Sequence, residues 1–423
     1  MILLKIGFQE ELKLKDKKLR PHLSQNLKYI KKMDNILELK YGCNPYQKNA
    51  KVLFNSPVSP LKVLNGTPSY INILDALAAW QLVKELKAAT GIASAASFKH
   101  VSPAGAAIAK PLDNTFLKSQ FISESNLSPV STAYIRARGG DRMCAFGDAA
   151  AVSETVDVSL ANIIKSEVSD LIIAPGYDAE ALEILRSKKK GGYLILQMDA
   201  DYEPTDIESK NVYGFTLQQS RNKATIDKTL FNKIVTANKN VSTEALQSLI
   251  VATIALKYTQ SNSITVAYDG QLVGVGAGQQ SRVHCLRLAC SKADKWFLQQ
   301  HPRVLGLEFI EGLKKPEKAN IVDQFLLWDE LSENEKQLMA TQLKTVPVPI
   351  SIEEKMNYIQ QYNGISLSSD AFFPFRDNID RASRSHVQYI AQPGGSLRDD
   401  ICIAAADEYN MVMFNTETRL FAH

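Results

Sequence analysis

A lysine and a histidine stand side by side in SFKHVSPAGAA, residues 97–107, at the end of a small apolar run. Neighbouring side chains of a regular strand face opposite sides, so both can enter one site only where the strand ends and the chain turns. Residues 102–105, Ser-Pro-Ala-Gly, are the expected turn. An ammonium group beside an imidazole favours the neutral, proton-accepting form of the ring. Lys99 and His100 therefore suit a general base beside a group that stabilises developing negative charge; the alternative is a polar strand end at a sheet edge.

A second candidate is the glycine-rich segment GVGAGQQSR, residues 274–282. Its glycines recur at every second position, whereas a dinucleotide-binding loop needs the spacing G-x-G-x-x-G inside a βαβ unit. A nicotinamide cofactor is therefore disfavoured. Glycines still allow a flat ligand to approach the backbone, and Arg282 at the start of the next helix could meet an anion. The alternative is a sharp turn between a strand and a helix.

Two further clusters mix charged residues with aromatic residues or glycines. SSDAFFPFRDNID, residues 368–380, carries three phenylalanines, expected in the core, and then charged residues expected at the edge of a buried pocket. RARGGDRMCAFGD, residues 136–148, sets three arginines among glycines. The alternative for the second cluster is a solvated loop around a helix end.

Several kinds of functional site are not expected, because the residues that they require are absent from the sequence. The five cysteines are scattered without a C-x-x-C pair and no His-x-Glu occurs, so we expect neither a disulfide framework nor a zinc site. A Walker loop for phosphate is absent. No apolar run approaches the roughly 18–20 residues of a membrane span, and the start of the chain has no small-residue cleavage site. We therefore expect an intracellular, cytoplasmic protein in a reducing compartment, without a membrane partner.

The rest of the chain alternates between helix and strand patterns, which is typical of an α/β fold. Apolar spacing predicts a helix from residue 73, with Asn72 and Asp75 near its cap, and a nearly all-apolar helix over 243–258. Expected strands are IASAASF, VSDLIIAPG, GGYLILQMD and a hairpin, SITVAYDGQLVGVGAG, that turns at Asp269-Gly270. The C-terminal section predicts helix, strand, glycine turn, helix and strand.

At 423 residues the chain exceeds one ordinary hydrophobic core, so two or three domains are expected. We expect a basic lead-in over 1–39, a first subdomain over 40–235 and a second over 236–423, with a helical insertion near 310–363. Residues 1–35 hold nine Lys and Arg against four Asp and Glu, an excess larger than the net charge of +4 of the whole chain. A solvated segment is expected there rather than a tail that binds nucleic acid.

An internal repeat is suggested by FKHVSPAGAA in the first half and LKYTQSNSIT in the second. In each half an Ala-rich helix precedes a lysine beside an aromatic residue or histidine and a run of small polar residues. This pattern predicts two similar α/β halves.

Nine segments together resemble the family of phosphoribosylaminoimidazolecarboxamide (AICAR) formyltransferases, the transformylase half of bifunctional purine-biosynthesis proteins, in a form closer to the eukaryotic pattern. Spread from about Lys40 to His423, they are KYGCNPYQ, LNGTPSYIN, ASFKHVSPAGAA, RARGGDRMCAFGD, EVSDLIIAPGY, IALKYTQSNS, GVGAGQQSRVHC, SSDAFFPFRDN and RLFAH. The resemblance implies two cytidine-deaminase-like subdomains without zinc, each a mixed sheet flanked by helices. It also implies a homodimer with sites at the subunit interface. The implied reaction moves a formyl group from 10-formyltetrahydrofolate to the 5-amino group of AICAR, on the route to inosine monophosphate.

The same resemblance assigns roles to particular residues. His100 would accept the proton of the attacking amine, Lys99 would stabilise the transition state, and Asn72 would position the reacting groups. The amine is conjugated to the imidazole and carboxamide, so deprotonation must accompany attack and the tetrahedral oxyanion must be held.

Binding residues follow from the matched motifs. Those implied for AICAR are Lys40, Tyr41, His100, Gly147, Asp170, Asn262, Arg282, Phe372 and Arg419, with Lys40 and Arg419 nearest its phosphate. Those implied for the folate are Val283, Asp377, Ser396 and Leu397. A structural potassium ion is implied near Thr259, Ser261, Ser263 and Asp370.

Four features depart from the family pattern. Lys40 stands where the family usually has Arg. A guanidinium that can make two parallel hydrogen bonds to a phosphate is thus replaced by a single ammonium charge. Tyr46 replaces a His, and the tail FAH differs. No cyclohydrolase region precedes Lys40, so we expect a monofunctional transformylase. The alternatives are a relative that uses formate and ATP, and a catalytically silent AICAR-binding paralogue.

Overall fold

The computed structural model describes residues 36–423, apart from residues 55, 57 and 125. Most of the basic lead-in expected over 1–39 therefore lies outside the described residues. Its last part contains β1 (Ile36–Glu38), which pairs antiparallel with β2 (Lys51–Leu53) in a small separate sheet.

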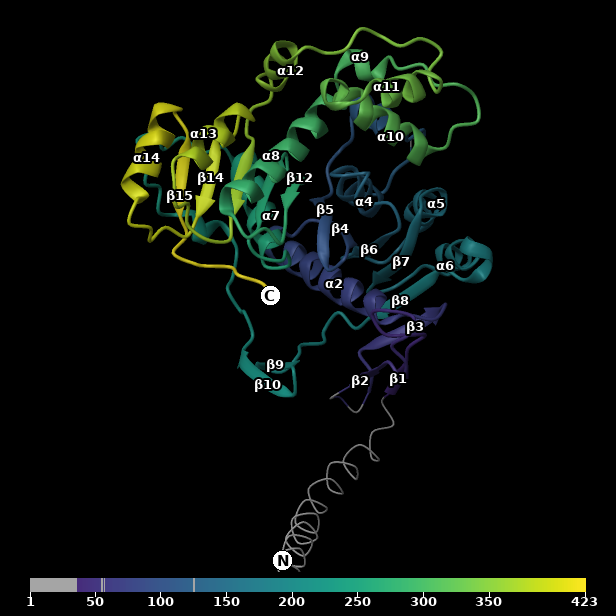
Figure 1. Cartoon of the computed structure of the whole chain (residues 1–423). Helices are drawn as coiled ribbons and strands as arrows, with labels where there is room; N and C mark the ends of the chain where they lie inside the picture. Colours follow the sequence, from purple (N-terminus) through teal and green to yellow (C-terminus); the bar gives the residue numbers. More distant parts are fainter. Residues whose placement is uncertain (1–35, 55, 57, 125) are drawn as a thin grey trace, which may run out of the picture.

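An eleven-stranded mixed sheet forms the body of the molecule (Figure 1). The first half of the chain supplies β3 (Leu61–Asn65), β4 (Ser94–Lys99), β5 (Ser102–Ile108), β6 (Asp148–Val152), β7 (Ser169–Ala174) and β8 (Leu194–Met198). The second half supplies β11 (Ile264–Tyr268), β12 (Gln271–Gly276), β13 (Ser366–Ser369), β14 (Tyr389–Gln392) and β15 (Val412–Asn415). The order across the sheet is β15-β14-β13-β11-β12-β5-β4-β6-β7-β8-β3.

The same pairing pattern occurs twice in this sheet. Along β5-β4-β6-β7-β8, successive neighbours pair antiparallel, antiparallel, parallel and parallel. Along β12-β11-β13-β14-β15 they pair in the same way. The two sets meet where Gln271 of β12 pairs antiparallel with Ala107 of β5, so both halves of the chain share one continuous sheet.

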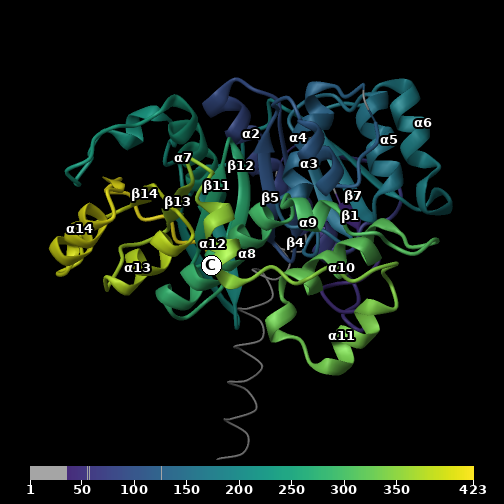
Figure 2. The same cartoon turned by 90° about the horizontal axis from the view of Figure 1, so that it is seen from above.

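Helices cover both faces of the sheet (Figure 2). On one face, α2 (Tyr70–Thr90) and α7 (Thr243–Leu256) pack against each other and share a core. The core of the other face includes α4 (Pro129–Gly139), α5 (Val158–Ser166), α6 (Ala179–Arg186), α8 (Arg282–Leu298), α13 (Asp377–Arg384) and α14 (Asp399–Glu408). Alternate strand residues serve the two cores, as Leu171 and Ile172 do on β7. The fold is therefore mixed α/β, as the alternating patterns predicted.

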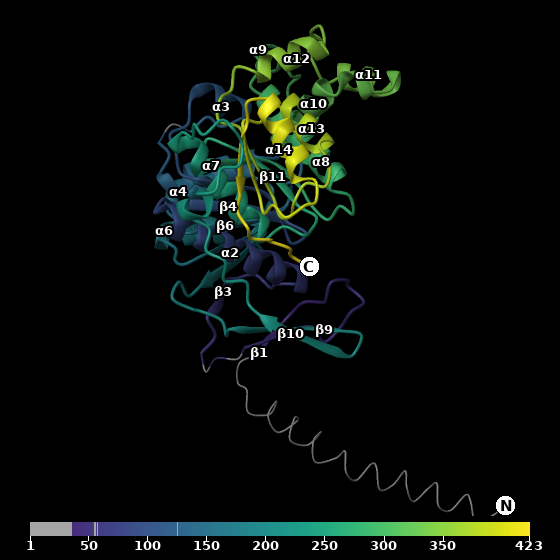
Figure 3. The ribbon, with the colours of Figure 1, turned by 90° about the vertical axis from the view of Figure 1, so that its left-hand side faces the viewer.

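The remaining elements lie outside the sheet. The short α3 (Asn114–Ser119) precedes α4, and the expected helical insertion contains α10 (Lys315–Leu326), η3 (Trp328–Glu330), α11 (Glu333–Ala340) and α12 (Ile352–Ile359), after α9 (Pro302–Leu305). Two short turns are η1 (Lys188–Gly191) and η2 (Lys228–Phe231). The hairpin of β9 (Ile207–Val212) and β10 (Phe215–Ser220) projects from the body (Figure 3). Within the described part of the chain, no helix is both long and apolar enough to cross a membrane.

One detail of the sequence interpretation is wrong. The expected turn at 102–105 is part of β5, and the chain turns instead at His100-Val101. The segments FKHVSPAGAA and LKYTQSNSIT, compared above as a repeat, also differ in structure: Lys99 of the first ends a strand, whereas Lys257 of the second follows the last residue of α7. In the repeated pairing pattern, β4 and β5 occupy the same places as β11 and β12. The turn at His100-Val101 therefore corresponds to the hairpin turn at Asp269-Gly270.

Candidate functional site

Strand direction brings the expected site residues to one edge of the sheet. We call it the site edge: the edge at which β4 ends at Lys99 and β5 begins at Ser102. Phe98 pairs with Ala149, so β6 begins there, directly after Gly147. The helix α2 runs back along β4, so its start, with Asn72, lies at the same edge.

The second half of the chain reaches the site edge as well. Because β12 is antiparallel to β5, it ends there, and Ile264 of β11 pairs with both Gly276 of β12 and Ser369 of β13. The segments that flank these strand ends contain the expected residues Asn262, Arg282, Asp370 and Phe372. β4 and β11 are separated by three strand spacings, or about 14 Å.

His100 occupies the tip of the β4–β5 hairpin. His100 has φ 53° and Val101 has φ 58°, so both residues adopt the left-handed conformation. This conformation is rare for a β-branched residue and costs free energy, which other contacts must offset. The unusual turn separates the imidazole from the ladder of the sheet and leaves His100 exposed.

The buried carboxylate of Asp75 holds this turn. Oδ1 of Asp75, on α2, accepts a hydrogen bond from the backbone N–H of Val101 at 2.5 Å. Burial raises the pKa of Asp75, while the Val101 hydrogen bond and the nearby charges of His100 and Lys99 oppose the rise. The sequence interpretation placed Asp75 only near a helix cap and missed this contact, because its partner lies 26 residues away.

Lys99 points at the loop that precedes β6. Its Nζ donates to the carbonyl oxygens of Phe146 at 2.6 Å and Gly147 at 3.2 Å. Gly147 has φ 73°, and a Cβ there would lie 3.0 Å from Lys99 Nζ and 3.4 Å from Oδ2 of Asp170. Asp170 itself pairs with Lys189 at 2.5 Å. The structure thus brings Lys99, Gly147 and Asp170 together.

Buried arginines fix the same loop. Arg138 donates to the carbonyl oxygens of Ala145 at 2.7 Å and Val168 at 3.1 Å, and pairs with Asp148 at 2.8 Å. With Glu167 it forms a further ion pair at 3.1 Å. The alternative of a solvated loop is therefore wrong for this arginine, which is 4% exposed.

Asn72, Lys40 and Tyr41 gather at the start of α2. Ser69 rather than Asn72 is the N-cap, and Oδ1 of Asn72 accepts from Ser69 N at 3.0 Å and Ser69 Oγ at 2.8 Å. The backbone of Lys40 and Tyr41 hydrogen-bonds to Pro68 and Tyr70, which flank this cap. The Lys40 ammonium lies 5.9 Å from the centre of the Tyr41 ring.

The second-half residues form their own buried network. The Arg282 guanidinium pairs with Oδ1 of Asp370 and donates to Oδ1 of Asn262 at 2.7 Å. Arg282 is 8% exposed and Asp370 is fully buried. The Arg282 guanidinium is therefore fixed in position by Asp370 and Asn262 of its own chain.

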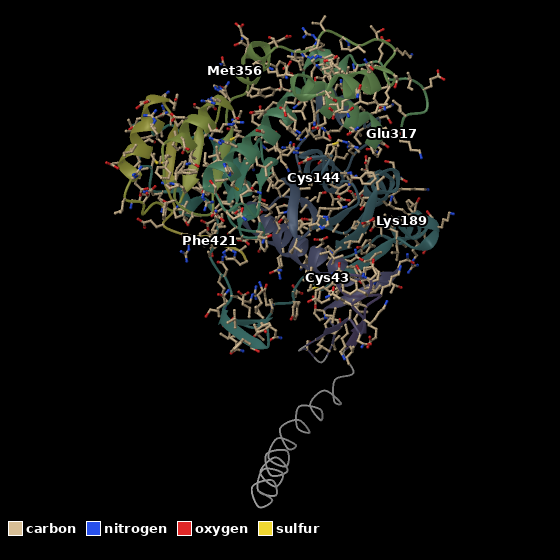
Figure 4. The ribbon with its side chains drawn as sticks, in the orientation of Figure 1. Cys43, Cys144, Lys189, Glu317, Met356 and Phe421 are labelled. Carbon is tan, nitrogen blue, oxygen red and sulfur yellow. The ribbon has the colours of Figure 1, made fainter. Side chains whose placement is uncertain are left out.

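The C-terminal tail lies over this network. Leu420 N donates to the carbonyl oxygen of Asp370, and Ser261 exchanges hydrogen bonds with the backbone of Ala422, all at 3.0 Å. The guanidinium of Arg419, which is exposed, lies 4.6 Å from the centre of the Phe421 ring. Phe421 and Lys189, the partner of Asp170, lie far apart in Figure 4. The first-half and second-half groups are thus separate within one chain.

The residues expected for the folate do not join into one cluster: Asp377 lies beyond β13, Ser396 and Leu397 follow β14, and Val283 lies on α8. Asp377 begins α13 and is exposed, Leu397 is fully exposed, and Val283 is partly buried on α8. Ser396 Oγ accepts from the backbone N–H of Arg398 at 3.1 Å. In the aromatic run before Asp377, Phe373 is buried, but Phe372 and Phe375 are 43% and 52% exposed, so only one of the three phenylalanines is core.

The glycines of 274–282 serve packing. A Cβ on Gly274 would lie 2.2 Å from the carbonyl oxygen of Ala289, and one on Gly276 would lie 2.3 Å from that of Cys285, both on α8. Glycine at every second position therefore lets α8 lie close against one face of β12. Gly278, with φ 64°, makes the turn that follows the strand.

The residues expected around potassium are close together, and most of their oxygens have partners. Thr259 donates to a helix carbonyl at 2.7 Å, and Ser261 donates to Oδ2 of Asp370 at 2.6 Å. Ser263 Oγ is buried and has no hydrogen-bond partner among the described residues. That hydroxyl fits an oxygen-bound cation, whereas Arg282 already neutralises Asp370.

Known proteins resemble this chain over most of its length. Residues 9–292, more than half of the chain, match the family model of the AICARFT/IMPCHase bienzyme. The chain is 33% identical to the bifunctional purine biosynthesis protein PurH of Roseobacter denitrificans and 32% identical to that of Cereibacter sphaeroides, each over 389 residues. These alignments cover 91% of this chain and 59% of each relative. The chain therefore spans about three fifths of the length of these curated relatives.

Proposed function

The chain belongs to the AICARFT/IMPCHase bienzyme family, and from this premise we propose that it transfers a formyl group from 10-formyltetrahydrofolate to the 5-amino group of AICAR. The observation that carries the proposal is the tip of the β4–β5 hairpin. There Lys99 and His100 follow each other at a turn held by Asp75, beside Gly147 and Asp170.

In this proposal His100 is the general base. The amine of AICAR loses a proton as it attacks the formyl carbon, and an exposed imidazole on a fixed turn can accept it. The bond between the formyl carbon and N10 of the folate then breaks, and the leaving N10 takes up a proton to give tetrahydrofolate. The Lys99 ammonium has three N–H donors, and the carbonyls of Phe146 and Gly147 take two of them. The third is available for the oxyanion of the tetrahedral intermediate. Asn72, whose side-chain oxygen is fixed by Ser69, positions the reacting groups.

The substrate residues divide between the two groups at the site edge. Lys40, Tyr41, Gly147 and Asp170 lie with His100 in the first, and Asn262, Arg282, Phe372 and Arg419 lie in the second. We propose that together they hold AICAR, with the cations Lys40 and Arg419 at its phosphate. The exposure of Lys40, Phe372 and Arg419 supports this role, because a ligand can reach them.

The folate is proposed to lie over the ends of β13 and β14. The exposed carboxylate of Asp377 can accept hydrogen bonds from the amino group of a pterin. Val283, Ser396 and Leu397 complete this part of the proposal.

A homodimer with sites at the subunit interface is part of the same proposal. Its support is the separation of about 14 Å between β4 and β11, which keeps the two groups of one chain apart. Exposed Phe146, Phe372 and Phe375 near the site edge give that edge an apolar surface for a second copy.

The repeated pairing pattern supports two cytidine-deaminase-like subdomains with a boundary near residue 235. A structural potassium ion near Thr259, Ser261, Ser263 and Asp370 is also proposed. Its support is the buried Ser263 hydroxyl, which has no hydrogen-bond partner among the described residues. A cytoplasmic location is proposed with the enzyme activity.

One assay separates this function from its alternatives. Purified protein is incubated with AICAR and, in turn, with 10-formyltetrahydrofolate or with formate and ATP, and formyl-AICAR is measured. Product with the folate alone is expected. Product only with formate and ATP would replace the folate donor, and no product with either donor would leave a silent binding protein.

A further inference from the structure

The loop between α4 and β6, residues 140–147, supplies two acceptors for the Lys99 ammonium, the carbonyl oxygens of Phe146 and Gly147. The loop reaches the surface, because the Phe146 side chain is 52% exposed. Surface loops are more mobile than the elements that they connect. Two carbonyls on a mobile loop would let the ammonium change its position, so the loop needs contacts that fix it from the buried side.

The guanidinium of Arg138 is buried beside this loop and contacts it on both sides of the two carbonyls. Nη1 donates to the carbonyl oxygen of Ala145 at 2.7 Å, one residue before them, and pairs with Asp148 at 2.8 Å, one residue after them. Nη2 donates to the carbonyl oxygen of Val168 at 3.1 Å. The same oxygen accepts the backbone N–H of Gly147 at 2.8 Å. One guanidinium thus fixes the short segment that carries both acceptors.

The ion pair with Asp148 also reaches the strand that carries Lys99. Oδ2 of Asp148 accepts a hydrogen bond from Oγ of Ser97 at 2.7 Å, and Ser97 lies two residues before Lys99 on β4. The side chains of Arg138 and Asp148 are 5% and 0% exposed, so water does not compete for these contacts. Arg138 therefore connects the strand that carries the ammonium with the loop that accepts from it.

These contacts need an arginine. Nε of Arg138 donates to Glu167 at 3.1 Å, so all three nitrogens of the guanidinium are engaged. A guanidinium presents five N–H donors in a rigid plane, whereas a lysine presents one ammonium at the end of a flexible chain. A lysine at this position would keep the positive charge near the two carboxylates, but it would not reach all of the acceptors at once.

Arg142 is a matched comparison on the same loop. Its side chain is also buried, at 9% exposed, and it also pairs with Glu167, at 3.2 Å. Among the described residues, its hydrogen bonds go to Glu167 alone. Arg142 therefore has the burial and the charge of Arg138 without its contacts to the loop carbonyls.

We propose that Arg138 is a positioning residue for Lys99. By fixing the carbonyls of Phe146 and Gly147, it holds two N–H groups of the ammonium in place and directs the third towards the oxyanion. Arg138 itself touches neither substrate in this account. The inference rests on the proposed function, because the oxyanion belongs to the proposed formyl transfer.

A double-mutant cycle in the full chain tests the catalytic part of the inference. Arg138→Lys should lower kcat for formyl transfer roughly 10- to 100-fold, whereas Arg142→Lys should leave kcat nearly unchanged. In a chain that already carries Lys99→Met, Arg138→Lys should lower the rate no further, because both residues act through the same ammonium. A purely structural arginine would lower the rate equally in both backgrounds.

Chemical labelling of Lys99 gives a readout that does not depend on catalysis. The protein is treated with trinitrobenzenesulfonate, and modification at Lys99 is followed by peptide mass spectrometry. Without its two fixed acceptors, Lys99 should react roughly three- to tenfold faster in Arg138→Lys than in the unchanged protein. Ser97→Ala, a smaller change that frees Asp148 from β4, should raise the labelling rate in the same direction, and Arg142→Lys should not raise it.

Two results would overturn the proposal. The first is that no folded variant of Arg138 or Ser97 labels faster at Lys99 than Arg142→Lys does. The second is that Arg138→Lys lowers the rate of formyl transfer equally with and without Lys99→Met. An unchanged protein that makes no formyl-AICAR would instead contradict the proposed function, and the labelling comparison would still decide whether Arg138 fixes Lys99.

Discussion

The carboxylate of Asp75 accepts the backbone N–H of Val101 at 2.5 Å and so joins α2 to the turn that carries His100. Val101 is β-branched and has φ 58°, a conformation that must be held from outside the turn. The buried group that holds it comes from the helix whose start carries Asn72. One helix thus positions two of the three residues proposed for catalysis.

Replacing Asp75 by Ala removes the acceptor and should let the turn relax. We expect the unfolding free energy to fall by about 1–3 kcal/mol, and kcat for formyl transfer to fall roughly 10- to 100-fold with little change in KM. Asp75→Asn retains an acceptor oxygen, so it should recover most of both losses. Steady-state kinetics and urea unfolding of the two variants measure these effects. Equal loss of kcat in both variants would mean that the charge, and not the hydrogen bond, is what matters.

Gly147→Ala should displace Lys99. The new Cβ would lie 3.0 Å from Lys99 Nζ at a residue with φ 73°. Gly91, at the end of α2, is the matched control, because it has φ 71° and no atom within 4 Å of a new Cβ. Both Ala variants should lose about 1–2 kcal/mol of stability from the left-handed backbone, but only Gly147→Ala should also lose formyl transfer. Similar activity in the two variants would remove Lys99 from the reaction.

Glu167 should make the free energy of unfolding depend on pH in the acid range. Burial raises the pKa of this carboxyl, but the charges of Arg142, Arg138 and Lys315 more than reverse the rise and lower the pKa from 4.5 to about 2. A carboxyl whose pKa is lower in the folded state contributes stability above its unfolded pKa and loses it as pH falls. We expect about 3 kcal/mol to be present above pH 4.5 and to disappear towards pH 2.

Urea unfolding of the unchanged protein and of Glu167→Gln over this pH range measures the effect. The variant should be less stable at pH 6, and the gap should close as the pH falls below 4.5. A gap that stays constant with pH would show that the carboxylate charge contributes nothing.

The buried pair of Arg282 and Asp370 should matter for folding far more than a surface pair. Asp370→Ala leaves the Arg282 guanidinium buried without its carboxylate, which should cost about 3–5 kcal/mol of unfolding free energy. Glu408→Ala, which breaks an exposed pair with Arg376, is the control and should leave stability nearly unchanged. Comparable melting temperatures for the two variants would contradict this difference.

Local patterns were enough to predict most elements of the fold. The apolar run before Lys257 predicted α7, and Asp269-Gly270 predicted the β11–β12 hairpin. Both predictions succeeded because the burial of a helix and the conformation of a tight turn depend on residues that are neighbours in the sequence. Glycines were interpreted less well. Gly105 looked like a turn residue, but a Cβ there would lie 2.0 Å from the carbonyl oxygen of Ala137, so its role is close contact between β5 and α4. Such a contact depends on a helix that the local pattern does not contain.

Contacts between distant segments explain the rest. Lys99 and His100 could be singled out by residue type, but the Asp75 carboxylate that holds their turn could not, since nothing near Asp75 in the sequence marks Val101 as its partner. The arginines of 136–148 were open to interpretation as a solvated loop, and only the approach of Glu167 and Asp148 makes Arg138 a buried ion pair. Polar residues buried by long-range pairing are therefore what the sequence interpretation missed.

The initial rate of formyl-AICAR formation by His100→Ala, with AICAR and 10-formyltetrahydrofolate at saturation, tests the central proposal most directly. His100 is exposed at the hairpin tip, so the variant should fold as the unchanged protein does, with the same circular dichroism spectrum and melting temperature. If His100 is the general base, the rate should fall by roughly 10²–10⁴-fold. A folded His100→Ala protein that retains the rate of the unchanged enzyme would contradict the account.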